Sequence, residues 1–362
     1  MVKNKKTILL ISGVYLPHLG GVERYTFELA SRLKSDYNVV IITTNTEGLA
    51  FDSVEDGVRV FRLPIKNLPQ KNRLPFLKKD AEYKQFMSEI RAIEVDHVII
   101  NTRLYETTFL GLKIAKEKGI RPWIIDHSGG YVLKPYERVS FKKLSRFGLK
   151  NIDFYSVSKA NQKFLKNEFG IISKGIFYNA IEPVEAPRKP RNIKKKILYA
   201  GRIMKTKGIE PLLSSFAKIE KKYNVELEIL GDGPLLEKMK ATPQKNVKFL
   251  GKVSHEKVLE KMDKSDIFVF PVLAPEGFPS VLLEAGIRKN AIIATKFQAM
   301  EELVGEDGIL IDRKAELLEE AFEELLKNPE KITEYQEKIR KRVIENFTWE
   351  RTIKKVKMEL EK

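Results

Sequence analysis

The segment IFVFPVLAPEGFPSVLLE, residues 267–284, decides the fold of this protein. Its start, Ile267–Pro271, is apolar throughout, so the strand that it predicts is buried on both faces, as in a parallel sheet covered by helices. A loop containing proline and glycine follows, and then an apolar stretch typical of a buried helix. This order of strand, loop and helix predicts one βα unit of an α/β protein.

Similar units occur along the rest of the chain in two groups, separated by Glu182–Lys196 (EPVEAPRKPRNIKKK). That segment has three prolines and no apolar periodicity, so it reads as a linker. With 362 residues, we expect two doubly wound, Rossmann-like α/β domains, residues 1–183 and 184–345. The predicted strands are Thr7–Ser12, Asn38–Thr44, Val58–Leu63, Asp96–Asn101, Pro122–Asp126, Ile152–Val157 and Gly175–Tyr178, then Ile197–Gly201, Val225–Leu230, Val247–Leu250, Ile267–Pro271, Ala291–Thr295 and Ile309–Ile311; three helices follow, Ala315–Lys327, Pro329–Glu345 and Trp349–Glu361.

Composition narrows the class of protein further. Hydrophobic residues make up 43% and charged residues 32%, which is typical of globular domains and argues against disorder. The formal net charge is +17, so an anionic partner or surface is expected. The absence of cysteine excludes disulfides, thiol nucleophiles and cysteine-bound zinc. No apolar run approaches the roughly 20 residues of a membrane span, so we expect a cytoplasmic protein.

The strongest motif is Pro275–Glu284, which has two carboxylates eight residues apart. If Pro279 is the first helical residue, Glu276 lies in the loop and Glu284 in the second turn of the helix. The free N–H groups at the start of the helix then point at an anion, while the two glutamates accept hydrogen bonds from hydroxyls. The alternative, a loop glutamate and an exposed helical glutamate, does not explain the apolar neighbours of Glu284. The residues expected to contact the ligand are Glu276, Gly277, Phe278, Pro279, Ser280, Val281 and Glu284.

Three glycine motifs follow other predicted strands. Gly201–Gly208 (GRIMKTKG) offers Arg202 and Lys207 to phosphate oxygens, or else these two cations are ordinary solvated surface. Gly231-Asp232-Gly233 permits close backbone approach to a ligand, or is simply a tight strand-to-helix turn. Gly20 and Gly21 precede a predicted helix, where an anion is favoured, and an ordinary glycine turn is again the alternative.

The order of these motifs resembles the retaining nucleotide-sugar glycosyltransferases of family 4, which have the GT-B fold. The pattern consists of P-x2-G-G, G-R-x4-K-G and E-G-F-P-x4-E, and the resemblance covers essentially the whole chain. It also includes His127 in IDHS, the segment Tyr178–Glu182 and the segment Phe347–Glu350. The resemblance implies that the two domains face each other across a cleft, and that the last helix, from about residue 346, crosses back to the first domain.

The resemblance also implies a role for each residue. Arg202 and Lys207 neutralise the diphosphate, Glu284 binds the ribose, and Glu276 with Gly277 and Phe278 holds the donor sugar. His127 contacts the sugar from the first domain, which binds the acceptor; a core histidine at a strand end is the alternative. Catalytic roles are thus expected for His127, Arg202, Lys207 and Glu276, and donor contacts for Gly20, Gly21, Gly201, Gly231, Gly277, Phe278, Pro279, Ser280, Val281 and Glu284.

The resulting prediction is a hexosyltransferase that uses a UDP- or GDP-sugar as substrate and a lipid-linked or cell-surface glycan as acceptor, in polysaccharide biosynthesis. No cofactor is expected, and no Asp-x-Asp or histidine spacing indicates a metal. A nucleotide-sugar epimerase of the same fold is a second hypothesis. The charge alone favours a third, a nucleic-acid-binding protein, but no recognised binding motif supports a nucleic-acid partner.

Two basic segments favour peripheral binding to the inner face of the cell membrane. Arg62–Lys79 contains six basic residues and no acidic one, and Lys134–Lys150 contains six and one. The second segment also spaces Tyr136, Val139, Leu144 and Phe147 at near-helical intervals, as in a basic amphipathic helix at a membrane surface. A solvated helix with one stripe in the core is the alternative.

Overall fold

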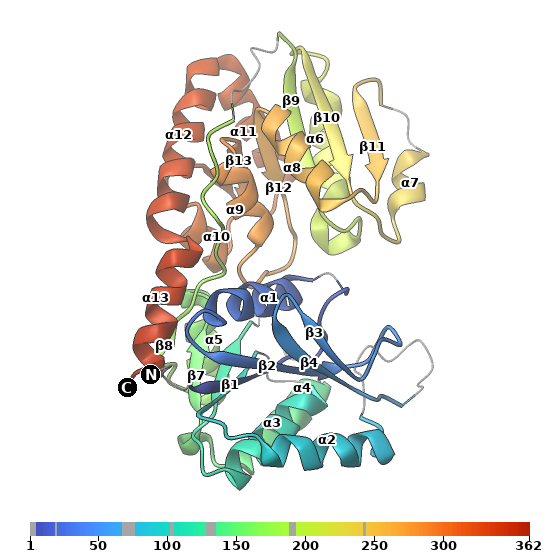
Figure 1. Cartoon of the computed structure of the whole chain (residues 1–362). Helices are drawn as coiled ribbons and strands as arrows, with labels where there is room; N and C mark the ends of the chain where they lie inside the picture. The colour runs from blue at the N-terminus through green and yellow to red at the C-terminus, as the bar shows by residue number, and fades with distance from the viewer. Residues whose placement is uncertain are drawn as a thin grey trace. The chain divides into compact units, whose positions relative to one another are not determined.

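The computed structural model describes residues 5–18, 20–66, 77–101, 105–127, 135–187, 193–241 and 244–362 (Figure 1). Contacts divide the chain into two compact units, Met1–Tyr178 with Ile353–Lys362, and Asn179–Thr352. Both units are α/β, with sheets whose strands are almost all parallel, so the predicted fold class is confirmed. The sequence placed the boundaries at 183/184 and 345/346, whereas the contacts place them at 178/179 and 352/353.

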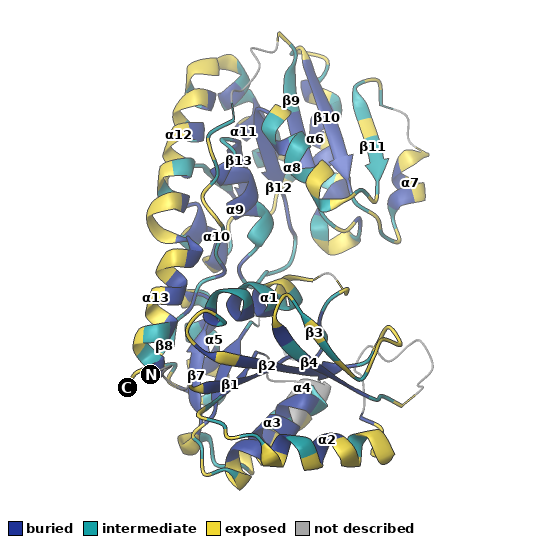
Figure 2. Ribbon diagram, viewed as in Figure 1, coloured by how far each residue is buried: buried dark blue, intermediate teal, exposed yellow. Residues whose placement is uncertain are grey.

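The described residues of the first unit form an eight-stranded sheet in the order β3-β4-β2-β1-β5-β6-β7-β8. All neighbouring strands are parallel except β3 and β4, which pair antiparallel. The central strands are buried on both faces, as Figure 2 shows, because helices cover both sides of the sheet. The elements are β1 (Thr7–Ile11), α1 (Gly21–Leu33), β2 (Asn38–Thr44), β3 (Asp52–Glu55), β4 (Val58–Leu63), α2 (Ala81–Ala92), β5 (His97–Ile100), α3 (Glu106–Glu117), β6 (Trp123–Asp126), α4 (Pro135–Ser145), β7 (Asp153–Ser156), α5 (Lys159–Phe169) and β8 (Gly175–Ile176).

The second unit has a six-stranded parallel sheet in the order β11-β10-β9-β12-β13-β14. Its core lies around apolar strands and the inner faces of α6 and α11. The elements are β9 (Lys195–Ala200), a 3-10 turn (Lys205–Lys207), α6 (Ile209–Ile219), β10 (Val225–Leu230), α7 (Leu236–Lys240), β11 (Val247–Gly251), α8 (His255–Lys264), β12 (Ile267–Phe270), α9 (Ser280–Ile287), β13 (Ala291–Thr295), α10 (Gln298–Leu303), β14 (Ile309–Ile311), α11 (Ala315–Lys327) and α12 (Pro329–Asn346). The last helix, α13 (Trp349–Leu360), begins in this unit, and its residues from Ile353 onward belong to the first unit.

In each sheet the strand order reverses at one point. The reversal lies between β1 and β5 in the first unit and between β9 and β12 in the second. In the second unit only Ile267 and Phe268 of β12 pair with β9, so the two strands separate toward their carboxyl ends. Ligands of such sheets bind outside the carboxyl ends at the reversal. Gly20 and Gly21 follow β1, Arg202 and Lys207 follow β9, and Glu276 follows β12, whereas His127 follows β6 and Gly231 follows β10.

Candidate functional site

The loops after β9 and β12 meet at the reversal point of the second unit. The first loop supplies Arg202 and Lys207, and the second supplies Glu276. Lys207 Nζ lies 2.6 Å from Glu276 Oε1, with both side chains only partly exposed. The backbone N–H of Leu273 donates to the carbonyl of Thr206 at 2.8 Å and fastens the loops together. The structure therefore brings together two residues that the sequence separates by 69 positions.

Glycines allow the backbone of the first loop to pack closely. Gly208 has φ of 71°, and a Cβ there would collide with the carbonyl of Pro271. Gly231 has φ of 132°, and a Cβ there would collide with the carbonyl of Gly201. Gly201 N–H donates to the carbonyl of Leu230 at 3.0 Å. Packing of the loop after β10 against the loop after β9 is thus one reason for the glycine at 231, and its donor contact stays a prediction.

Arg202 lies at the edge of this arrangement with an exposed side chain. Its carbonyl accepts a hydrogen bond from the Tyr199 hydroxyl at 3.0 Å, which fixes the backbone. Burial, together with the nearby Glu276 carboxylate, raises the pKa of Tyr199, so this phenol stays protonated and able to donate. The guanidinium has no ion-pair partner in the described part of the chain, so it is available to an anion.

The segment before α9 differs by one residue from the sequence prediction. Pro279 is the residue before the helix, with ψ of 109°, and the helix begins at Ser280. The proline ring fixes φ but leaves ψ extended, which suits the position that precedes a helix. Phe278 is held by Asn179, whose Nδ2 donates to the Phe278 carbonyl at 2.7 Å, and by the ring of Phe347 at 5.3 Å. The ligand contacts predicted for residues 277–281 stay predictions.

Glu284 lies in the second turn of α9 and is 8% exposed, so the alternative of an exposed helical glutamate is wrong. Its Oε1 lies 3.5 Å from His255 Nε2, at the first residue of α8. Ser254 caps α8 by accepting a hydrogen bond from the N–H of Lys257. His255 is a neighbour of Glu284 that the sequence did not indicate, because only the packing of α8 on α9 brings it there.

In the first unit, Gly20 precedes α1 in an extended conformation and Gly21 begins the helix. The carboxylate of Glu23 folds back over this helix end, where a Cβ on Gly20 would collide with it. Burial raises the pKa of Glu23, although its own N–H and His18 act in the opposite direction. Apart from the chain neighbours and backbone of α1, no atom of the described residues lies within 4 Å of an ideal Cβ position on Gly21. Their donor contacts stay predictions.

His127 follows β6 and belongs to a buried polar network. Its Nε2 lies 2.6 Å from Oδ1 of Asn101, which directly follows β5. The ring of Tyr25 on α1 packs edge-on against the imidazole, with centroids 4.7 Å apart. Burial lowers the pKa of His127 to about 4, against the weaker opposite effect of Asp126. The imidazole is therefore neutral at pH 7 and remains partly exposed.

Two family models match the chain in succession. "Glycosyltransferase Family 4" matches residues 19–183, and "Glycosyl transferases group 1" matches residues 183–343. The chain belongs to this family of glycosyltransferases. Each model covers most of one group of predicted strands, and together they include every predicted site residue.

Relatives and solved structures agree with this family. A protein of Methanocaldococcus jannaschii described as an uncharacterized glycosyltransferase is 26% identical and covers 98% of this chain and 97% of its own. The GPI3 subunit of phosphatidylinositol N-acetylglucosaminyltransferase of Saccharomyces cerevisiae is 26% identical over 82% of this chain and 69% of its own. The crystal structure of Anabaena HepE in complex with UDP and glucose has a TM-score of 0.76 at 16% identity, over 98% and 99% of the two chains. That likeness shows the GT-B fold.

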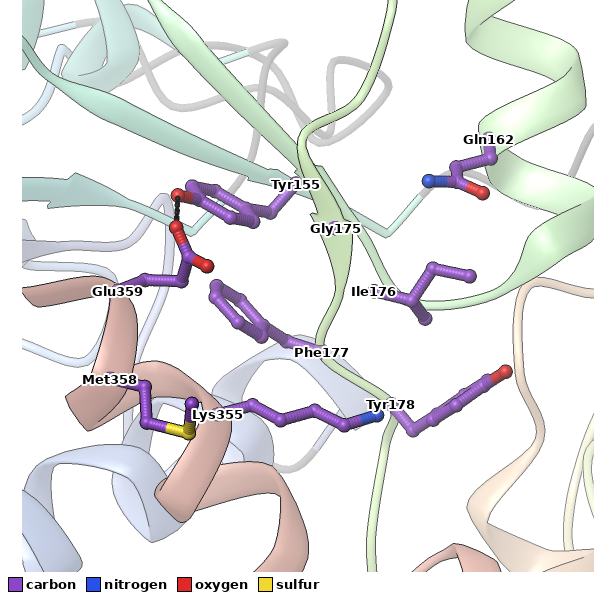
Figure 3. Close-up of a pocket in the computed structure, with 9 residues that line it drawn as sticks. All are labelled: Tyr155, Gln162, Gly175, Ile176, Phe177, Tyr178, Lys355, Met358 and Glu359. Carbon is purple, nitrogen blue, oxygen red and sulfur yellow. Dashed lines mark hydrogen bonds between the residues drawn. The ribbon is translucent and has the colours of Figure 1, made fainter. Parts of the chain in front are cut away.

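The glycosyltransferase also has a pocket of about 370 Å³ in its first unit, formed by β7, β8, α5 and α13 (Figure 3). Tyr155 donates to Glu359 at 3.1 Å, and Lys355 Nζ lies 5.5 Å from the ring centroid of Tyr178. Burial and the carboxylate of Glu359 raise the pKa of Tyr155. None of the predicted donor or catalytic residues lines this pocket.

The basic segments of the glycosyltransferase are described only in part. Residues 67–76 of Arg62–Lys79 lie outside the described residues, as do Lys134, Ser128 of the IDHS segment and residues 188–192 of the linker. In α4 and the turn after it, Leu144 is buried and Phe147 packs against the core, whereas Val139 is 67% exposed. Part of the predicted apolar stripe, Leu144 and Phe147, therefore packs in the core of the first unit.

No helix among the described residues is both long and apolar enough to cross a membrane. Within the same residues, no three His, Asp or Glu side chains gather as ligands for a metal ion.

Proposed function

We propose that the protein is a retaining hexosyltransferase that takes a hexosyl unit from a UDP- or GDP-sugar and transfers it to a glycan or lipid-linked acceptor. The observation that carries the proposal is the Lys207–Glu276 pair at the strand reversal of the second unit, next to the start of α9. A cation and helix N–H groups suit a diphosphate, and a carboxylate suits sugar hydroxyls. The UDP and glucose in the HepE crystal structure support a nucleotide-sugar donor.

In the proposed reaction, the bond between the anomeric carbon and the diphosphate oxygen breaks, and the acceptor oxygen bonds to that carbon on the same face. The acceptor proton goes to the departing phosphate oxygen. Arg202 and Lys207 stabilise the charge that grows on this oxygen, and Glu276 holds the sugar by its hydroxyls. Such stabilisation acts most strongly in the transition state, because that is where the leaving group gains its charge.

The donor is tested by thermal unfolding with UDP, GDP and ADP and their sugars, since a ligand that binds only the folded state raises Tm. We expect a rise with uridine or guanosine diphosphates, reduced in both Arg202→Ala and Glu284→Ala. The exposed Lys205→Ala is the control and keeps the full rise. A panel in which no nucleotide moves Tm contradicts the proposal.

Product analysis tests the reaction class. Incubation of the identified donor with an acceptor should give a glycoside whose anomeric configuration, measured by NMR coupling constants, equals that of the donor. Inversion contradicts the retaining mechanism. A free epimer formed without acceptor supports the epimerase instead. Full activity after treatment with EDTA is the outcome expected for a metal-independent enzyme.

We infer a lipid-linked acceptor and a peripheral membrane site from two observations. One relative is named for action on phosphatidylinositol. In addition, Lys142, Lys143 and Arg146 in and after α4 are exposed. Basic residues near a surface attract anionic lipids by about 1 kcal/mol each.

Co-sedimentation with phosphatidylserine vesicles at low salt tests this surface. We expect binding that Lys142→Glu with Arg146→Glu abolishes. Lys84→Glu with Lys113→Glu makes the same change of charge on exposed residues elsewhere in the unit and should retain most of it. Equal losses of vesicle binding in the two double variants contradict a specific membrane-binding surface at Lys142 and Arg146.

A further inference from the structure

A chain of buried hydrogen bonds behind His127 determines which atoms of the imidazole carry a proton. The hydroxyl of Ser12 donates to the carbonyl of Val14 at 2.7 Å. The hydroxyl of Thr26 donates to the carbonyl of Val22 at 2.8 Å, with the Ser12 oxygen as a longer second acceptor at 3.4 Å. A carbonyl only accepts, so each hydroxyl uses its hydrogen there. The Thr26 oxygen then has only lone pairs left to offer.

Asn101 is oriented by this oxygen. Its Nδ2 donates to Thr26 Oγ1 at 2.6 Å, and both residues are fully buried. The side-chain amide of Asn101 therefore presents its oxygen to the other side, where His127 Nε2 lies 2.6 Å away. Because an amide oxygen only accepts, Nε2 must carry the hydrogen of that bond.

The remaining nitrogen of His127 is then an acceptor. In a neutral imidazole with its proton on Nε2, Nδ1 has a free lone pair. Nδ1 has no hydrogen-bond partner within the described ranges, and the side chain is partly exposed. The edge-on ring of Tyr25 restricts rotation of the imidazole, so the lone pair keeps one direction.

We propose that Asn101 is a positioning residue which, held by Thr26, fixes His127 as the Nε2–H tautomer, so that Nδ1 accepts a hydrogen bond from a hydroxyl of the transferred sugar. The proposal rests on the proposed function for the sugar contact, but its hydrogen-bond geometry belongs to the free protein. The lone pair on Nδ1 also determines which donor sugars are preferred. A lone pair attracts a hydroxyl or an amide N–H and repels a carboxylate, so a neutral hexosyl donor is favoured over the uronate with the same base.

The first test is 15N NMR of the imidazoles in the full-length protein without ligand. The chain has four histidines, and His127→Gln assigns the signal of interest. We expect shifts of a protonated Nε2 and an unprotonated Nδ1 at pH 7. Asn101→Asp replaces the amide with a carboxylate, which should hold His127 doubly protonated at that pH.

Two threonine variants complete the test. Thr26→Val removes the oxygen that orients Asn101 and should mix the two tautomers of His127. Thr43→Val is the matched control, since Thr43 is a fully buried threonine outside this network, and the His127 signals should not move. A proton on Nδ1 in the wild type, or the same His127 signals in Asn101→Asp and wild type, overturns the proposal.

The second test measures transfer. With a neutral hexosyl donor, Asn101→Asp should lower kcat about tenfold or more, the size of one lost hydrogen bond, with a smaller change in KM. The ratio of kcat/KM for the uronate over the neutral sugar should rise in this variant. An unchanged ratio contradicts the role of Nδ1. If no nucleotide-sugar is turned over while the tautomer is as expected, the proposed function fails and the positioning by Asn101 stands.

Discussion

Lys207 and Glu276 neutralise each other at the strand reversal of the second unit. Both are partly exposed, so the pair contributes little to folding stability, since exposed ion pairs are worth about 0–1 kcal/mol. The ion pair holds each of the two side chains in one position. The nearby ring of Phe270, with its centroid 5.6 Å from Lys207 Nζ, adds a wall on one side.

Replacing Lys207 tests its role in the transition state. Lys207→Ala should lower kcat about 10²–10³-fold, as loss of one donor to a developing charge does, while donor binding changes much less. Steady-state kinetics with the identified donor measure both quantities. Lys205→Ala, in the same turn but exposed, should keep wild-type kcat. If Lys207→Ala lowered kcat and donor affinity by the same factor, Lys207 would also stabilise the bound donor before the reaction begins.

The low pKa of His127 predicts how stability depends on pH. The folded protein holds this group neutral down to about pH 4, whereas in the unfolded chain it takes up a proton near its ordinary value of 6.5. The unfolded state therefore binds more protons between these values, and stability falls as pH decreases from 6.5 to 4. Urea unfolding at a series of pH values gives the slope of the unfolding free energy against pH.

His127→Gln should reduce that slope. His97→Gln should reduce it as well, because burial lowers the pKa of His97 in the same direction. Full retention of the slope in His127→Gln would show that His127 does not titrate in this way.

At the level of elements, the sequence predicted the strands well. Strands β2, β4, β10, β13 and β14 have the predicted bounds. Strands β2 and β13 are nearly continuous apolar runs buried on both faces, and apolar residues still mark the ends of β4 and β10, although charged residues interrupt both. Strand β3 was missed, since its residues DSVE are mostly polar and lie at the sheet edge. The turn Asp56-Gly57, with φ of 47° and 73°, is a hairpin signal that the sequence contained.

Loops were predicted less completely than strands. The glycines and the charged residues of the candidate site were proposed because they follow predicted strand ends, and their roles stay predictions. Their partners were not, since the pairs His255–Glu284 and Asn101–His127 depend on packing between elements distant in the sequence. A polar residue directly after an apolar strand is the only local sign that Asn101 carried.

The 3-10 turn before α6 depends on Gly208. Gly208→Ala forces an alanine into the left-handed region of φ, and its Cβ collides with the Pro271 carbonyl. This variant should therefore lose at least about 3 kcal/mol of stability. Gly251→Ala is the control, because Gly251 has a similar φ of 68° and no atom within 4 Å of an added Cβ. It should cost only about 1–2 kcal/mol. Thermal unfolding compares the two, and equal losses would mean that the loops do not pack as described.

Across the whole molecule, the two units differ in how their chains are assembled. The second unit is one continuous segment, Asn179–Thr352, whereas the first is made from Met1–Tyr178 and Ile353–Lys362. Helix α13 contributes Val356 and Leu360 as buried residues of the first unit. The last helix thus completes a core that the sequence begins more than three hundred residues earlier.

Substitutions in α13 should therefore affect the first unit. Val356→Ala removes two methyl groups at a fully buried position and should cost about 1–3 kcal/mol. Met358→Ala, in the same helix but 56% exposed, should stay within about 0.5 kcal/mol of wild type. Hydrogen exchange assigns the loss to a unit, and faster exchange confined to residues 179–352 would contradict the division.

The return of α13 has a consequence for biosynthesis. Domains emerging from a ribosome generally fold as units in the order of their synthesis. Here the amino-terminal part lacks helix α13 until translation has passed residue 360, while the intervening part has already received all of its own residues. The nascent polypeptide is thus expected to mature from its middle outward, and its earliest-made half is the one most in need of a chaperone.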